Sequence, residues 1–275
     1  MTSEDQGPIR TSEVGERLVE LLRILDKLRS PGGCPWDREQ TSRSLIPYLL
    51  EETYELIESI ESGNHAALKE ELGDLLLHVL FQGAIAEDEG WFTLEDSMAG
   101  ITQKLVDRHP HVFGEDKDKA DGAFHAKQNW EQAKQREKSR SSRMDGVPRH
   151  LPALTRARRI QEKAAYVGFD WDTVEPVWEK VLEELEELRA AHQSQDTDAL
   201  EDELGDLLFS LVNLGRFLGV NPEGALRKAI AKFEYRFRNI EKELQARGKT
   251  PEESTLEEMD EIWNRYREGY TPKGE

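Results

Sequence analysis

Closely spaced carboxylates on predicted helices are the residues of this sequence best suited to chemistry. Glu52 and Glu55 stand three positions apart, and Glu71 and Asp74 repeat that spacing further along the chain. Residues three apart share one helical face, so each pair sets two carboxylates side by side. If a turn brings the pairs together, the carboxylates repel one another, and a divalent cation relieves that repulsion. An all-oxygen ligand set favours Mg²⁺, or Mn²⁺, over zinc.

The acidic pattern is written twice in the chain. The blocks EETYEL (51–56) and ELGDLL (71–76) align with EELEEL (183–188) and ELGDLL (203–208) at one offset of 132 positions. Two blocks that match at one offset indicate an internal duplication. A single Glu-x-x-Glu is most often a solvated helix face, so the duplication is what favours a site. The candidate ligands of the second copy are Glu184, Glu187, Glu203 and Asp206.

Basic and aromatic residues follow each acidic block at matching places. They are Lys104, Arg108, Trp130 and Lys134 in the first copy, and Lys232, Arg236, Trp263 and Arg267 in the second. A Lys and an Arg four apart share a helical face and suit a phosphate chain whose charge a metal ion alone does not neutralise. Each tryptophan either stacks on a nucleobase or fills a core.

Helices must position these residues. The apolar positions at i, i+3, i+4 and i+7 are Leu72, Leu75, Leu76 and Val79, and again Leu204, Leu207, Leu208 and Leu211. This spacing gives each block one apolar stripe of an α-helix. Polar turns at 61–65 and 192–198 predict an antiparallel hairpin in each copy. Because no segment alternates with the period of a strand, the sequence predicts an all-α protein of two tandem helical bundles.

The acidic blocks also contain glycines and a histidine whose positions predict structural roles. Gly73 and Gly205 stand inside the predicted helices, where a glycine costs about 1 kcal/mol relative to alanine. We therefore expect another helix to approach closely at both glycines. His78 lies four residues after Asp74, but Ser210 takes its place in the second copy. We expect His78 to pack or to support a ligand.

Composition changes mark the boundaries of the two copies. We expect disorder over residues 1–14, a first repeat over 15–137, a linker over 138–152 and a second repeat over 153–275. The linker region is polar, rich in Ser and Arg, and closed by two prolines.

The charge balance excludes some classes of partner. Acidic residues outnumber basic residues by 56 to 37, which gives a net charge of −19 and a pI near 4.9. That charge opposes binding to nucleic acid or to an anionic membrane. The single cysteine, Cys34, excludes an intramolecular disulfide, and we find neither a secretory signal nor an apolar run that could span a bilayer. We therefore expect a cytoplasmic protein without nucleic-acid or membrane partners.

Taken together, these residues resemble the MazG family of nucleoside triphosphate pyrophosphohydrolases. The family signature Glu-Glu-x-x-Glu followed by Glu-x-x-Asp stands here as Glu51, Glu52, Glu55, Glu71 and Asp74, and again as Glu183, Glu184, Glu187, Glu203 and Asp206. The strings GGCPWDREQT, RHPHVFG and EELGDLL also resemble family strings. The resemblance extends over nearly the whole chain and matches the family members that have two repeats.

The resemblance implies an activity, a cofactor and an assembly. The activity is hydrolysis of nucleoside triphosphates between the α and β phosphorus atoms, in nucleotide-pool control or sanitation, with Mg²⁺ required. The signature acids other than Glu51 and Glu183 would hold the metal. The phosphate chain would lie on Lys104, Arg108, Lys232 and Arg236, with later substrate contacts from Trp263 and Arg267 and their counterparts Trp130 and Lys134. Arg267 departs from the lysine that is common at its position. A homodimer is also implied.

One carboxylate must orient or deprotonate the attacking water. Glu51 and Glu183 are candidates, as is a weakly ligating member of each acidic set. We expect the second copy to be the better catalyst. Pro110 places Arg108 at a helix end, whereas the helix that carries Arg236 can continue.

Other functional classes fit the sequence less well. A di-iron carboxylate bundle requires Glu-x-x-His pairs, which neither copy has. The sequence also lacks the glycine-rich phosphate loop of P-loop ATPases. The alternative that stays open is a non-catalytic helical module that binds nucleotides or a protein partner.

Overall fold

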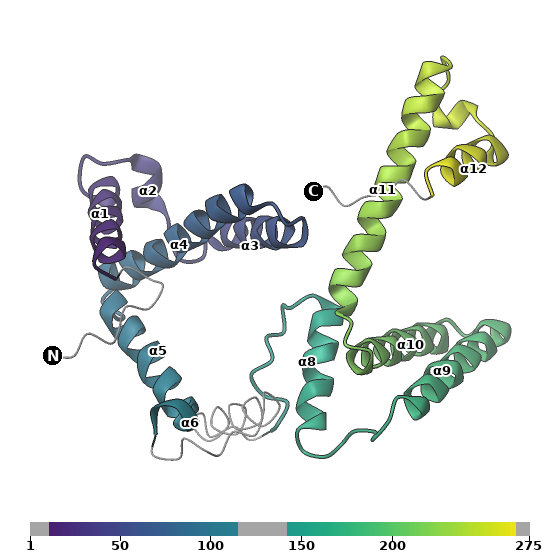
Figure 1. The fold of residues 1–275 in the computed structure, drawn as a ribbon, viewed down its shortest axis with the longest axis horizontal. Helices are drawn as coiled ribbons and strands as arrows, with labels where there is room; N and C mark the ends of the chain where they lie inside the picture. The colour runs from purple at the N-terminus through teal and green to yellow at the C-terminus, as the bar shows by residue number, and fades with distance from the viewer. Residues whose placement is uncertain (1–10, 115–141, 268–275) are drawn as a thin grey trace. The chain divides into compact units, whose positions relative to one another are not determined.

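The computed structural model describes residues 11–114 and 142–267. Every regular element within these ranges is a helix, which confirms the predicted all-α class. The chain divides into two compact units, and the described residues 11–114 belong to the first and 142–267 to the second (Figure 1). Each unit carries one of the two acidic blocks.

The helices of the first unit are α1 (Thr11–Arg29), α2 (Pro35–Glu39), α3 (Ile46–Glu61), α4 (His65–Asp88), α5 (Leu94–Arg108) and α6 (Pro110–Phe113). Those of the second unit are α8 (Ala153–Ala165), α9 (Glu175–Ser194), α10 (Thr197–Phe217), α11 (Pro222–Ala246), the short 3₁₀ helix η1 (Pro251–Glu253) and α12 (Leu256–Arg265). Since α1 begins at Thr11, the predicted disordered segment 1–14 is too long at its end. Residues 115–137, at the end of the predicted first repeat, lie outside the described residues, so that boundary stays a prediction.

A tight polar turn folds each acidic block into the predicted hairpin (Figure 1). Between α3 and α4, Gly63 takes a positive φ of 68°, and the side chain of Asn64 accepts hydrogen bonds from the first backbone amides of α4. Between α9 and α10, Gln195 takes a positive φ of 58°, and Asp196 caps α10 in the same way. Capping satisfies amides that the helix leaves unpaired, so both turns stop one helix and start the next.

The core of the first unit lies at the end of its hairpin. Leu25 of α1, Leu45 before α3, and Leu80, Phe81 and Ile85 of α4 are all buried. Nearby, the backbone turns so tightly after α1 that a Cβ at position 33 would lie 2.2 Å from the carbonyl oxygen of residue 28. Only glycine fits there.

The second unit has two separate apolar clusters. Val177 and Val181 of α9 pack with Leu214 of α10. A second cluster joins α11 to α12, where Ile240 and Leu244 meet Ile262. The hairpin and the α11–α12 pair are therefore stabilised by different sets of apolar contacts.

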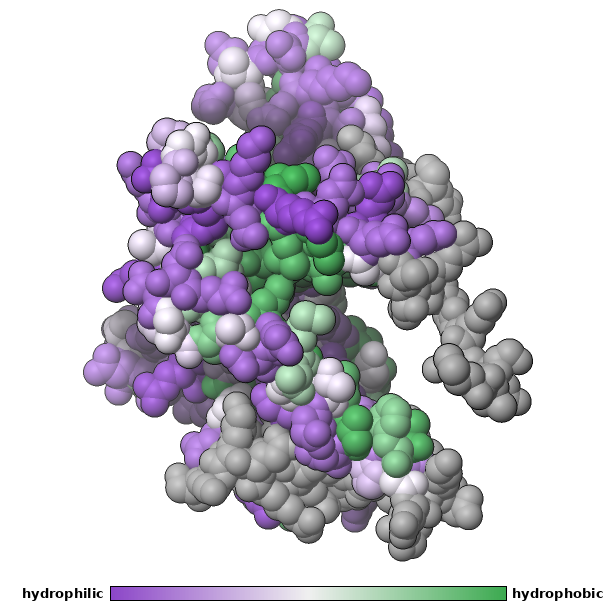
Figure 2. Space-filling model, turned by 90° about the vertical axis from the view of Figure 1, so that its left-hand side faces the viewer, coloured by the Kyte–Doolittle hydropathy of each residue, from purple (hydrophilic) through white to green (hydrophobic). Residues whose placement is uncertain are grey.

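The predicted apolar stripes lie on α4 and α10, and most of their residues are exposed within their own units. Leu72 is 53% exposed and Leu204 is 48% exposed, whereas Leu75 and Leu207 on the same stripes are half-buried. Figure 2 shows apolar side chains on the surface between hydrophilic ones. Contiguous exposed apolar area on a folded protein usually marks an interaction surface.

The expected close helix approach at the two glycines is wrong for contacts within each unit. A Cβ added at Gly73 or at Gly205 would meet no atom within 4 Å. Both glycines lie on the solvent side of their hairpins, where the facing helix does not reach them. Among the described helices, none is both long and apolar enough to cross a membrane.

Candidate functional site

The first acidic cluster lies where α3 and α4 face each other. Carboxylate oxygens of Glu52, Glu55 and Glu71 lie within 4.8 Å of one another. Glu52 and Glu55 share a face of α3, and Glu71 comes from α4, so the hairpin assembles the cluster. Glu52 and Glu71 are half-buried, whereas Glu55 is exposed. Three of the four acids predicted as ligands in the first copy are thus together.

Burial and mutual repulsion raise the pKa of two carboxyls in this cluster. For Glu52, desolvation is the largest cause, followed by the charges of Asp74, Glu55 and Glu71. The pKa of Glu71 is also raised, mainly by desolvation and then by Glu55 and Asp74, while a hydrogen bond with Glu52 acts in the opposite direction. Asp74 therefore lies near the other three acids, although it is outside their 4.8 Å group.

The second acidic cluster repeats the arrangement on α9 and α10. Carboxylate oxygens of Glu184, Glu187 and Glu203 again lie within 4.8 Å of one another. Glu184 is buried, with 5% of its surface exposed, so its charge is costly unless compensated. Desolvation, followed by the charges of Glu184 and Glu203, raises the pKa of Glu187. The fourth predicted ligand, Asp206, is exposed and outside this group.

A lysine that the sequence reasoning missed compensates the second cluster. The ammonium nitrogen of Lys180 lies 2.7 Å from a carboxylate oxygen of Glu184 and 2.8 Å from one of Glu183. Hydrogen bonds to these two carboxylates hold the pKa of Lys180 far above its ordinary range. The signal was present, since a Lys four positions before a Glu shares its helical face. At the offset of 132 positions, Tyr48 stands in its place in the first copy.

The two residues predicted as bases differ in their surroundings. Glu51 is exposed on α3. Its counterpart Glu183 is held by Lys180, so its carboxylate is already oriented. Further along α4, His78 is half-buried, and its Nδ1 is buried without a hydrogen-bond partner.

The basic residues of the first copy lie on α5. That helix ends at Arg108, as Pro110 predicted. Arg108 is buried, with 7% of its surface exposed, whereas Lys104 is exposed. The predicted contacts Trp130 and Lys134 lie outside the described residues.

The late residues of the second copy come together around Arg236. Its guanidinium carbon lies 5.1 Å from the ring centre of Trp263, and one of its nitrogens donates a 2.7 Å hydrogen bond to the backbone oxygen of Arg267. Phe233 packs against the same tryptophan at 5.1 Å between ring centres. Lys232 is exposed beside them on α11. We call Lys232, Arg236, Trp263 and Arg267 the basic group.

The structure keeps the basic group apart from the acids of its own copy. The acids lie within the α9–α10 hairpin, whereas the basic group lies on α11 and at the end of α12 (Figure 1). Within residues 142–267, no hydrogen bond, ion pair or ring contact joins the two groups. The acids and the basic group of the second unit are therefore two separate groups of side chains.

The acidic clusters have the chemistry of a hard-cation site. Two oxygens bound to one Mg²⁺ at its usual distance are about 4.2 Å apart at most. Groups of three carboxylate oxygens within 4.8 Å are close to that limit, a spacing compatible with ligation of one ion. Half-buried carboxylates that raise one another's pKa also gain most from a cation.

A protein-family model matches the same parts of the chain. The model, described as the MazG nucleotide pyrophosphohydrolase domain, matches residues 40–113 and 172–240. Each matched segment contains one acidic hairpin. The two matches agree with a tandem repeat.

Relatives match along the chain as well. The nucleoside triphosphate pyrophosphohydrolase/pyrophosphatase MazG of Thermotoga maritima is 49% identical over 259 residues, which covers 94% of this chain and 98% of the relative. The nucleoside triphosphate pyrophosphohydrolase of Escherichia coli is 46% identical over 253 residues, or 90% of this chain and 95% of the relative. A protein of that name from Mycobacterium tuberculosis is 43% identical over 159 residues, 57% of this chain and 47% of the relative. This chain therefore belongs to the MazG nucleotide pyrophosphohydrolase family.

Proposed function

We propose that this protein hydrolyses nucleoside triphosphates between the α and β phosphorus atoms, releasing a nucleoside monophosphate and pyrophosphate. The observation that carries the proposal is the pair of acidic clusters, each with three carboxylate oxygens within 4.8 Å of one another. Relatives that match nearly the whole chain are named for this activity. Control or sanitation of the nucleotide pool is the role that fits such a reaction.

We propose Mg²⁺, with Mn²⁺ as a substitute, as the cofactor of the acidic clusters. The ligands would be Glu52, Glu55, Glu71 and Asp74 in the first copy, and Glu184, Glu187, Glu203 and Asp206 in the second. When bound, Mg²⁺ polarises the phosphoryl oxygens and lowers the pKa of the attacking water.

The protein's own residues carry the remaining steps. Lys232 and Arg236 neutralise the phosphate chain and the charge that develops on the leaving pyrophosphate. Trp263 and Arg267 contact the nucleoside end, and Lys104, Arg108, Trp130 and Lys134 have these roles in the first copy. Glu51 and Glu183 orient the attacking water or accept its proton. Lys180 holds Glu183 and Glu184 by ion pairs, so its ammonium can exchange a carboxylate for a phosphate oxygen when nucleotide arrives.

We propose that the second copy is the better catalyst. Its arginine, Arg236, lies inside the long helix α11, whereas Arg108 is the last residue of α5. The second cluster also has Lys180, where the first has Tyr48. The repeats themselves are proposed to span 15–137 and 153–275.

A homodimer is the assembly that we propose. The exposed residues of the stripes on α4 and α10, such as Leu72 and Leu204, are not covered within their own units, and a second chain would cover them. Each hairpin presents two helices, and a second hairpin would complete a four-helix bundle. In the same assembly, the basic group of one chain can reach the acids of the other.

The test of the reaction measures pyrophosphate release from a panel of ribo- and deoxyribonucleoside triphosphates, with Mg²⁺ and with EDTA. We expect Mg²⁺-dependent release of pyrophosphate, and no release by the double variant Glu71→Gln/Glu203→Gln. If the wild type binds nucleotides but releases nothing, the chain is a binding module. Release of orthophosphate would contradict the proposed bond cleavage.

The test of the assembly combines light scattering with complementation. The protein should have the mass of two chains. A mixture of Glu203→Gln chains and Arg236→Ala chains, unfolded and refolded together, should regain pyrophosphate release because one of its sites has both halves intact. A mixture that stays inactive, while wild type refolded in parallel regains activity, contradicts a site shared between chains.

A further inference from the structure

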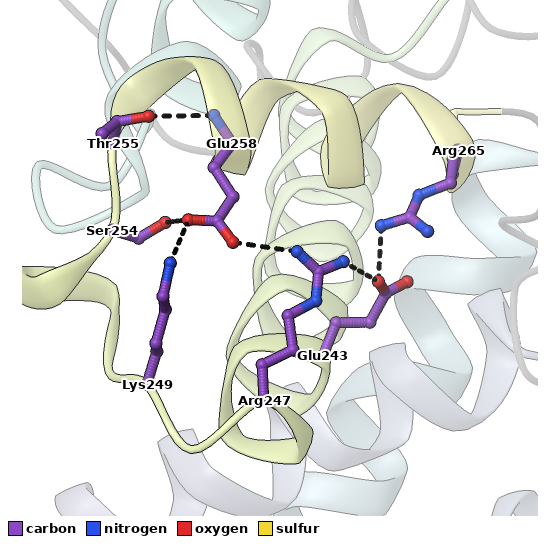
Figure 3. A network of polar contacts seen from close by, with 7 residues as sticks. All are labelled: Glu243, Arg247, Lys249, Ser254, Thr255, Glu258 and Arg265. Carbon is purple, nitrogen blue, oxygen red and sulfur yellow. Dashed lines mark hydrogen bonds and ion pairs between the residues drawn. The ribbon is translucent and has the colours of Figure 1, made fainter.

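A network of charged side chains joins α12 to the end of α11. Arg247 donates to two carboxylates at once, to Glu258 at 2.9 Å and to Glu243 at 3.1 Å. Glu258 also accepts from Lys249 at 3.0 Å and from the hydroxyl of Ser254 at 2.9 Å. Figure 3 shows Arg247 between the two carboxylates. One guanidinium thus connects a residue of α11 with a residue of α12.

The same network has a second end. Arg265, at the end of α12, donates to Glu243 on α11 (Figure 3). Tyr266 hydrogen-bonds to Glu243 as well, which raises the pKa of the tyrosine. Hydrogen bonds from Lys249 and Ser254, and then from Arg247, lower the pKa of Glu258 to about 2. Glu258 is therefore charged at neutral pH, and both carboxylates accept hydrogen bonds from more than one residue.

The apolar contact between α11 and α12 does not by itself fix the rotation of α12 against α11. Ile240, Leu244 and Ile262 are buried between the helices, but apolar burial is not directional. Hydrogen bonds to charged groups require a narrow range of distance and angle. The network, which we define as Glu243, Arg247, Lys249, Ser254, Glu258 and Arg265, therefore fixes the rotation and register of α12.

The contact between Arg236 and Trp263 joins the same two helices as the network. On α11, Arg236 is seven residues before Glu243, so the two share one face, and Arg247 follows directly after the helix. On α12, Trp263 follows Ile262 directly and lies two residues before Arg265. The contact of Trp263 with the guanidinium of Arg236 at 5.1 Å depends on how α12 is rotated against α11.

We propose that Glu258 is a positioning residue for nucleotide binding, acting through α12 to hold Trp263 and Arg236 in the arrangement that receives the nucleotide. This inference rests on the proposed function, in which the basic group contacts substrate. Glu258 itself does not touch the basic group, so it affects binding only through the helix that it anchors.

Glu258 is expected to affect nucleotide binding more than the stability of the fold. Partly exposed ion pairs contribute little to stability when taken singly, and Glu258 retains 22% of its side-chain exposure. The apolar cluster keeps α12 in place when the network is weakened. Loss of the charge of Glu258 should therefore loosen the orientation of α12 more than it unfolds the helix.

The test is a double-mutant cycle of Glu258→Gln with Trp263→Leu in the full-length protein. The measurements are KM and kcat for pyrophosphate release, and the Kd of an α,β-nonhydrolysable ATP analogue. We expect Glu258→Gln to raise KM and Kd about fivefold, within the range of coupled sites, with kcat nearly unchanged. In the Trp263→Leu background the same change should alter Kd less than about twofold, because the residue it positions is gone.

The matched control is Glu257→Gln, which removes the same charge from the neighbouring exposed residue of α12. It should leave KM and Kd at wild-type values. Equal effects of the two variants, or an undiminished effect of Glu258→Gln in the Trp263→Leu background, would overturn the inference. So would a lower melting temperature of Glu258→Gln at unchanged Kd, which indicates a purely structural role. A wild type that neither hydrolyses nor binds nucleotide contradicts the proposed function instead.

Discussion

The two acidic clusters have the same skeleton and different electrostatics. Each takes two glutamates from one helix of a hairpin and one from the other, within 4.8 Å. In the first cluster, no cation among residues 11–114 forms an ion pair with these acids, and two carboxyls have raised pKa values. In the second, Lys180 neutralises part of the charge, and Glu184 is buried.

This difference shows that helical spacing brings the acids together, while the residue four positions before Glu52 or Glu184 determines whether their charge is compensated. Tyr48 and Lys180 occupy equivalent positions. Tyr48 packs edge-on against Trp36 at 5.8 Å, whereas Lys180 turns its ammonium onto the carboxylates. The duplicated acidic motif therefore has an aromatic neighbour in the first copy and a cationic neighbour in the second.

The largest expected effect separates the copies by activity. Glu203→Gln should reduce kcat for pyrophosphate release more than about 100-fold, since even residues that only support metal ligands affect activity about 10–100-fold. Glu71→Gln should reduce it far less if the second copy does most of the work. Stopped-flow pyrophosphate detection on both variants measures the ratio. Equal losses would show that the copies act as equals.

The next largest effect is on Mn²⁺ affinity, when Lys180 and Tyr48, which distinguish the clusters, are exchanged. Lys180→Tyr removes a cation that competes for the second cluster, so Mn²⁺ should bind there about tenfold more tightly without nucleotide, while pyrophosphate release falls. An opposite charge at this range typically shifts a carboxyl by about 1–3 pKa units. Tyr48→Lys should weaken Mn²⁺ binding at the first cluster by a similar factor. Calorimetric titration measures both.

The control for this exchange is Lys180→Arg, which keeps the positive charge. It should leave the affinity for Mn²⁺ close to that of wild type. If Lys180→Tyr and Lys180→Arg behave alike, the charge of Lys180 does not govern cation binding.

A smaller effect appears in the pH dependence of stability. The raised pKa values of Glu52 and Glu71 mean that the folded state holds protons more tightly than the unfolded chain. Their contribution to stability is therefore fully present below the ordinary pKa of 4.5 and is lost as the pH rises through the raised values. Hydrogen exchange in α3 and α4, corrected for intrinsic rates, should show protection falling above pH 4.5.

Two comparisons test the origin of this pH effect. Glu71→Gln should flatten the decline in α3 and α4, and added Mg²⁺ should reverse it. The decline in α9 and α10 should be weaker, because Lys180 opposes the pKa rise of Glu187. An equal decline in both hairpins would show that Lys180 does not offset the repulsion.

Sequence predicted the parts of this molecule that depend on local spacing. The all-α class, the two hairpins and the end of α5 at Arg108 follow from periodicity, turn residues and Pro110. Three acids per copy gather as their spacing on the helices predicted. The fourth acid differs between copies, with Asp206 exposed and Asp74 half-buried, and helical spacing alone does not predict that difference.

Contacts between distant residues could not be predicted in this way. Arg247 lies eleven residues from Glu258, across a turn, and nothing in the local pattern selects that pair. The apolar stripes were identified correctly, but their exposure depends on what covers them. The separation between the acids and the basic group could not be predicted either, because tertiary packing determines how α11 and α12 lie relative to α10.

The smallest effect concerns the glycine that both copies share. Gly73→Ala and Gly205→Ala should each stabilise its helix by about 0.5–1 kcal/mol, because alanine has the higher helix propensity and a Cβ at either position meets no atom of its own unit within 4 Å. Hydrogen exchange of α4 and α10 measures the gain separately in each copy. Because each glycine adjoins a stripe proposed to face a second chain, light scattering must accompany it. If only one of the two variants weakens self-association of the protein, the hairpin that carries that glycine is the one that a partner helix approaches most closely.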